Sequence, residues 1–68
     1  MNPPVITDKG NFFYIDGKLA LTVKYSPEYG HYVENAEGKP TLTHCSGNER
    51  ARRWARDECE KMITRLSI

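Results

Sequence analysis

The chain has 68 residues, a length that supports one domain around a single core. Hydrophobic residues make up 38% and charged residues 28%, which is typical of a globular domain and excludes a disordered tail. The net charge of +1 excludes a strong overall attraction to nucleic acid or membrane, and no apolar run approaches the ~20 residues that span a bilayer. The N-terminus lacks the basic and apolar regions of a secretory signal. We therefore expect a single cytoplasmic domain over residues 1–68.

The first strong signal is a β-hairpin that begins near residue 11. Asp16-Gly17 is a preferred pair for a two-residue type I′ turn, in which both residues adopt positive φ. Pairing outward from this turn places Phe13 beside Ala20 and gives the hairpin one buried face. That face is expected to carry Phe12, Tyr14, Leu19, Leu21, Val23 and Tyr25. Residues 5–7 before the hairpin are compatible with a short strand, which the predicted sheet does not count.

A second hairpin is predicted over residues 31–44. Residues 35–38, Asn-Ala-Glu-Gly, suit a type I turn that closes with a glycine at positive φ. Val33 and Leu42 are the expected inward residues. Pro40 cannot donate a hydrogen bond to a neighbouring strand, so the last strand is expected at an edge of the sheet.

A helix is predicted over about residues 47–66. Ser46 and Glu49 match the S-x-x-E capping box, in which each side chain binds the other residue's backbone amide. The helix has one narrow apolar stripe that consists of Ala51, Trp54, Ala55, Cys59, Met62, Ile63 and Leu66. The predicted fold is therefore α+β: a four-stranded antiparallel meander of two hairpins, over about residues 11–45, with the C-terminal helix packed on one face.

The residues give little support for catalysis or metal binding. His44 and Cys45 are adjacent on a predicted strand, so their side chains are expected on opposite faces, where they cannot share a metal or form a nucleophile–base pair. His31 and Cys59 add no metal-ligand spacing, and we expect both cysteines to be reduced. We expect no catalytic residue, no metal and no cofactor, and hence a protein that is not an enzyme.

An arginine cluster at the helix start is the first candidate binding feature. Arg50, Arg52, Arg53 and Arg56 lie where the positive end of the helix dipole disfavours cations, and Glu49 neutralises one charge at most. Two alternatives remain open. The arginines are placed for an acidic partner, or they solvate the helix, for which arginine has high propensity.

The outer face of the predicted sheet is the second candidate. If the helix covers one face, Phe13 and Ile15 face away from it and are expected to be exposed in the monomer. An N-terminus folded over this face is the alternative. Tyr25, Tyr29 and Tyr32 lie near the turn between the hairpins and add the aromatic residues that interfaces favour.

Residues 18–63 resemble, in outline, the arm-type DNA-binding domains of phage integrases. The likeness rests on Ser46, Glu49, Ala51 and Trp54 at the start of a helix that follows a sheet. It implies that the sheet enters the DNA major groove. The chain differs from those domains in its strands, where lysines are matched by glutamates.

In size and in its lack of catalytic motifs, the chain also resembles the small accessory proteins of phages, including anti-CRISPR inhibitors. That likeness implies a non-enzymatic protein that covers a surface of a host protein. From the near-neutral charge we expect a protein partner with an acidic surface, which the arginine-rich helix and the exposed sheet face bind together and inhibit. A sheet-plus-helix DNA-binding module and a self-associating structural protein, for example a homodimer, remain as alternatives, and no membrane is expected.

Overall fold

The protein is described by a computed structural model that covers residues 4–66, except for the side chain of Leu66. Five strands precede one helix, and the sheet order β1-β2-β3-β4-β5 follows the chain, with every neighbouring pair antiparallel. The elements are β1 (Ile6–Lys9), β2 (Phe12–Ile15), β3 (Lys18–Ser26), β4 (Gly30–Asn35), β5 (Pro40–Cys45) and α1 (Asn48–Leu66). The predicted α+β meander with one C-terminal helix is confirmed. The prediction of four strands is wrong.

The additional strand is β1, which extends the first hairpin at one edge of the sheet. Its start is fixed to the β2–β3 turn by two hydrogen bonds of 2.9 Å: the Val5 amide donates to Asp16 Oδ1, and the Asp16 amide donates to the Val5 carbonyl. Three of the four residues in β1 are polar. Such a segment lacks the apolar alternation that identifies a strand in a sequence, and pairing with β2 compensates for it.

The turn of the first hairpin forms as predicted, but the strands beyond it are shifted. Asp16 and Gly17 have φ of 51° and 80°, which confirms the type I′ pattern. Tyr14 pairs with Leu19, whereas Phe13 pairs with Leu21, so that Ala20 forms a β-bulge without a partner. One extra residue in β3 reverses the facing of β2 relative to the predicted register.

Because of this bulge, the residues that face the helix and those that face solvent differ from the predicted ones. Phe13 is buried in the core with 2% of its surface exposed, and Ile15 packs against the core, although both were expected to face solvent. Phe12 and Leu19, expected inside, are 47% and 40% exposed. Tyr25, the last residue of the predicted inward face, is also exposed. The expected burial of Leu21 and Val23 is confirmed.

The second hairpin matches its prediction. Gly38 closes the turn with φ of 84°, and the Asn35 side-chain oxygen accepts hydrogen bonds from the amides of Glu37 and Lys39. Val33 pairs with Leu42, Val33 is fully buried, and Leu42 packs against the core. Pro40 begins β5, which is an edge strand as predicted.

The helix begins at Asn48, one residue beyond the predicted start. The Gly47 carbonyl accepts the first helical hydrogen bond, from the Ala51 amide at 3.1 Å, so Gly47 occupies the cap position. Within residues 4–66 neither the Ser46 nor the Glu49 side chain makes a hydrogen bond. The predicted capping box is therefore wrong.

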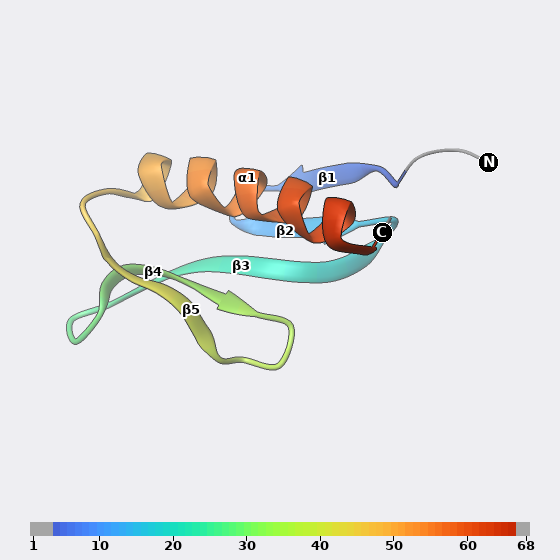
Figure 1. Cartoon of the computed structure of the whole chain (residues 1–68). Helices are drawn as coiled ribbons and strands as arrows, with labels where there is room; N and C mark the ends of the chain where they lie inside the picture. Colours follow the sequence, from blue (N-terminus) through green and yellow to red (C-terminus); the bar gives the residue numbers. More distant parts are fainter. Residues whose placement is uncertain (1–3, 67–68) are drawn as a thin grey trace.

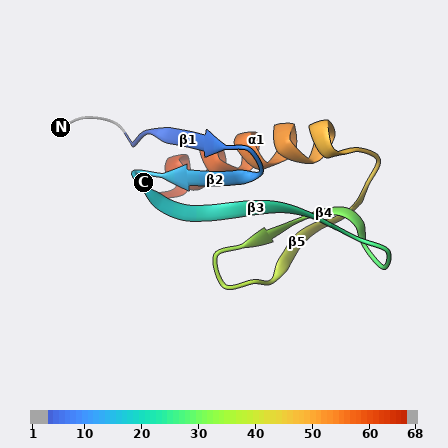
Figure 2. The same ribbon diagram turned by 180° about the vertical axis from the view of Figure 1, so that it is seen from behind.

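The helix lies along one face of the sheet and contacts every strand (Figure 1). Ala51, Ala55 and Cys59 are completely buried, and their small side chains let α1 approach the sheet closely. Trp54 and Met62 are partly buried and pack against this core from its margins. The predicted apolar stripe is thus confirmed for these five residues, and Ile63 is also partly buried. The part of the prediction that concerns the Leu66 side chain lies outside the described residues. Seen from behind, the strands lie in front of the helix, and no described element covers their outward face (Figure 2).

Candidate protein-binding site

The four arginines are distributed over both flanks of the helix: Arg50 lies toward β5, Arg52 and Arg56 lie toward β1, and Arg53 lines the hollows on both sides. Arg52 and Arg56 share the flank that faces β1, where Asp8 is paired with Phe13 and therefore points toward the helix. The Arg52 guanidinium lies 3.2 Å from Asp8 Oδ2, and that of Arg56 lies 3.7 Å from Asp8 Oδ1. Side chains as exposed as these form ion pairs worth about 0–1 kcal/mol each. Two of the four arginines thus have an acidic partner inside the chain.

The flank that faces β1 contains a cleft of about 250 Å³ between α1 and β1. Its lining consists of Asp8, Phe13, Glu49, Arg52, Arg53 and Arg56. Arg52 Nε is buried there without a hydrogen-bond partner among the described residues. The two acids leave this cleft with one net positive charge, and Arg52 and Arg56 are already paired with Asp8, so Arg53 is its one arginine without an ion pair among the described residues.

The opposite flank of α1 forms an open groove of about 450 Å³ against β5, which we call the α1–β5 groove. It is lined by Leu42, Cys45, Arg50, Arg53, Trp54 and Asp57. Leu42, Cys45 and Trp54 are partly buried and give the groove an apolar part that continues from the core. The charged lining residues are exposed.

Arg50 and Arg53 are the arginines of the cluster that remain available for an external partner. Neither makes an ion pair or a side-chain hydrogen bond within residues 4–66. Asp57 lines the same groove, so the groove has one net positive charge. An arginine beside a partly buried tryptophan is a combination that is enriched where proteins bind one another.

The outward face of the sheet carries an apolar strip, but not the predicted one. Phe12, Tyr14 and Leu19 form it, because Tyr14 is the cross-strand partner of Leu19 and lies two residues from Phe12 on β2. Phe13 and Ile15 lie on the helix side and contribute nothing to this surface. If this face binds a partner, the residues that contact it are therefore Phe12, Tyr14 and Leu19 and not Phe13 and Ile15.

The tyrosines near the β3–β4 turn do not form one cluster. Tyr29 and Tyr32 meet edge to face at 5.5 Å between ring centroids, and the ring of His44 is 6.5 Å from that of Tyr29. Tyr25 instead contacts His31, its cross-strand partner, with the ring centroids 4.9 Å apart and the ring planes tilted by 58°. The predicted aromatic patch is thus two separate groups.

The thiols and histidines converge on no reactive centre within residues 4–66. Both cysteines are free, as expected, and burial is the main cause that raises the pKa of Cys59 above its ordinary value. His44 adopts a left-handed backbone conformation with φ of 61° and is exposed, whereas Cys45 packs against the core. Among the described residues, no three histidine, cysteine or acidic side chains come together as metal ligands.

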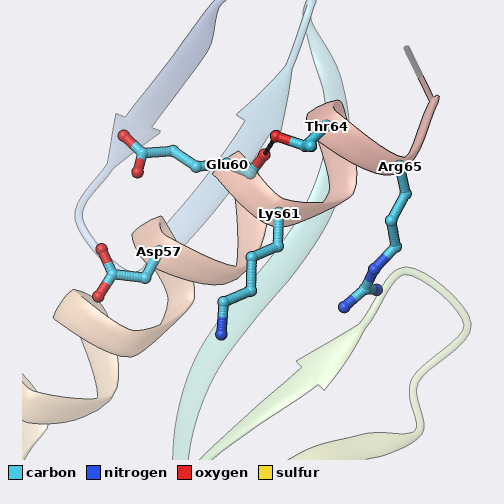
Figure 3. A pocket seen from close by; sticks show the side chains of 5 residues that line it. All are labelled: Asp57, Glu60, Lys61, Thr64 and Arg65. Atoms are coloured by element: carbon cyan, nitrogen blue, oxygen red, sulfur yellow. Dashed lines mark hydrogen bonds between the residues drawn. The ribbon is translucent and has the colours of Figure 1, made fainter. Parts of the chain in front are cut away.

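Another hollow, of about 460 Å³, lies on the solvent side of α1 near its C-terminal end. Its lining is Asp57, Glu60, Lys61, Thr64 and Arg65. Figure 3 shows that the two acids extend to one side and the two cations to the other, while Thr64 Oγ1 donates to the Glu60 carbonyl at 3.1 Å. Side chains that diverge in this way do not form a binding site.

Comparison of the chain with protein-family models, curated proteins and solved structures finds no match. Within the described residues, no helix combines the length and the apolar character needed to cross a membrane. The candidate site is therefore defined by the geometry of this chain alone. The sequence singled out Arg50 and Arg53, but it assigned Trp54 to the core-facing stripe of the helix and did not connect Leu42 and Cys45 with the site, because only the packing of α1 beside β5 brings them together.

Proposed function

We propose that the chain is a small, non-enzymatic binding protein that holds an acidic segment of a protein partner in the α1–β5 groove. The observation that carries this proposal is the placement of two unpaired arginines, Arg50 and Arg53, beside the partly buried Trp54. Arginine binds carboxylates in a bidentate manner, and tryptophan supplies apolar contact area. Together they favour a segment in which acidic residues flank an apolar one.

The physiological role follows from this mode of binding. A protein of this size that occupies a partner's acidic surface acts by excluding other ligands from that surface. In this respect it resembles the phage accessory proteins that inhibit host proteins, and we propose inhibition as its function. Two free thiols suit a reducing compartment, so the proposed partner is cytoplasmic.

The fluorescence of Trp54 can report binding in the groove, because Trp54 is the only tryptophan in the chain. The probe is a synthetic peptide with a leucine flanked by glutamates, and its control is the same peptide with glutamines. We expect the acidic peptide to shift the emission of Trp54 in a saturable manner. The glutamine peptide should bind at least tenfold more weakly.

Charge reversal identifies the groups responsible. Arg50→Glu combined with Arg53→Glu should weaken peptide binding at least tenfold, or about 1.4 kcal/mol, while acids near the helix start leave folding intact. The matched control is Lys39→Glu with Lys61→Glu, which changes the net charge equally outside the groove. Equal losses in both variants, or equal binding of both peptides, would contradict the proposal.

A further inference from the structure

The outward face of the sheet is built in rows that the strand register defines. One row crosses four strands, because Lys9 pairs with Phe12, Phe12 with Thr22, and Thr22 with Glu34. Cross-strand partners point to the same side of a sheet. This row therefore carries a cation at its β1 end, a phenylalanine and a threonine in the middle, and an acid at its β4 end.

A second row lies next to the first, on the side of the Asp16-Gly17 turn. It consists of Thr7, Tyr14 and Leu19, which are partners across β1, β2 and β3. Phe12 and Leu19 leave 47% and 40% of their surfaces exposed, so the two rows share a continuous apolar centre. Thr22, although it also faces away from the helix, is 5% exposed and makes the centre of the face well packed.

We propose that two copies of the chain pair through these outward faces. The two copies are related by a two-fold axis that lies in the interface, parallel to the strands and above the gap between β2 and β3. Such an axis places β2 of one copy over β3 of the other. Tyr14 then meets Leu19 of the second copy, and Phe12 lies over Thr22 of the second copy, which is already buried in its own sheet and adds little contact area. The two ends of the longer row exchange places, so Lys9 meets Glu34 of the second copy.

This charge arrangement favours a second copy over other occupants. Opposite charges at the two ends of one row become complementary to themselves under the two-fold axis, as an isologous interface requires. Glu34 already pairs with Lys24 at 2.8 Å, so Lys9 of the second copy would join an existing charge pair. A nucleic acid would instead meet this acid, and it would find only two lysines on the described part of the face.

The size of the face sets the expected affinity. Strands spaced by ~4.8 Å and four to six residues long outline a surface about 15 Å across, which buries on the order of 500 Å² over both copies. This area is below that of a standard specific interface and is typical of weak association. We therefore expect a weak dimer with a dissociation constant in the upper micromolar range.

Disulfide trapping tests the dimer and the direction of its axis together. The full chain is prepared with Cys45→Ser and with either Lys9→Cys or Glu34→Cys. Under the proposed axis the two copies of either position lie three strand spacings apart, ~14 Å, which is too far for a disulfide between two identical variants. A mixture of the two variants should form a linked dimer on mild oxidation, whereas each variant alone should not. Linkage of Lys9→Cys to itself would overturn the proposed axis.

Sedimentation velocity over micromolar concentrations tests association without cysteines. The wild type should convert from monomer to dimer, and Phe12→Ser should weaken the dimer at least tenfold while its circular dichroism remains unchanged. Tyr25→Ser is the control, because it removes an exposed aromatic residue outside the two rows. A wild type that stays monomeric at millimolar concentration, or a Phe12→Ser dimer of undiminished stability, would overturn the proposal.

Discussion

Folding raises the pKa of the Cys59 thiol. Burial first, and the neighbouring Glu58 second, raise its pKa, so the folded chain keeps the thiol proton at a pH where the unfolded chain has lost it. Its stabilising effect is therefore complete below the unfolded pKa of about 8.5 and is lost as the pH rises toward the folded pKa. We expect the midpoint of thermal unfolding to fall above about pH 8.5, and to fall less steeply in Cys59→Ala.

Burial of Cys59 can be tested by thiol labelling, in which the partly exposed Cys45 serves as the internal control. A thiol reagent should modify the partly exposed Cys45 in the native protein and reach the buried Cys59 only on unfolding. Modification of both at equal rates under native conditions would mean that α1 does not seal the core.

The arginines show what a sequence conveys about a residue and what it does not. Their position at a helix start is visible in the sequence, as is the electrostatic cost of that position. The acid that binds two of them is not, because Asp8 lies more than forty residues away in a strand without apolar alternation. Arg52 and Arg56 are therefore engaged within the chain, whereas Arg50 and Arg53 are free to bind a partner, although the spacing along the helix does not distinguish the two pairs.

At the scale of elements, the bulge at Ala20 decides which of two adjacent phenylalanines is structural. We expect Phe13→Ala to destabilise the domain by about 3–5 kcal/mol, which would unfold much of so small a protein, because the side chain is almost fully buried. Phe12→Ala should cost about 1 kcal/mol or less, since its side chain is half exposed. Urea unfolding in dilute solution measures both. Equal costs, or a larger cost for Phe12, would show that the register is the one that the sequence predicts.

The same bulge explains why the sequence predicted the elements better than their faces. Turns depend on local chemistry, so Asp16-Gly17 and Gly38 were sufficient to locate both hairpins. The stripe on α1 follows from helical spacing alone. A bulge depends on how β3 fits both the helix and β2 at once, and a shift of one residue exchanges the two faces of a strand. The outward strip was consequently predicted as a feature but assigned to the wrong residues.

At the scale of the whole molecule, the two proposed surfaces lie on opposite sides of the sheet. The α1–β5 groove borders the helix, whereas Phe12 and Leu19 face away from it. One partner surface cannot cover both in a single flat contact, which separates two features that the sequence suggested would act together. A dimer through the outward faces leaves both grooves accessible and makes the protein bivalent. A bivalent protein gains avidity for a partner that presents two acidic segments.

The distribution of positive charge over the molecule also tests the alternative of a DNA-binding module. A sheet that enters the major groove needs basic residues on its outward face, where the described strands place Lys9 and Lys24, the latter paired with Glu34. The unpaired Arg50 and Arg53 lie on the helix side of the sheet and add no positive charge to its outward face. We expect duplex DNA to bind no more tightly than ~10⁻⁴–10⁻⁶ M at physiological salt, as non-specific complexes do. Fluorescence anisotropy with duplexes of unrelated sequence, repeated at several salt concentrations, measures this affinity. Tight, sequence-dependent binding that Lys9→Glu abolishes and Arg53→Glu leaves unchanged would instead identify the outward face as a DNA reader and the chain as an arm-type domain.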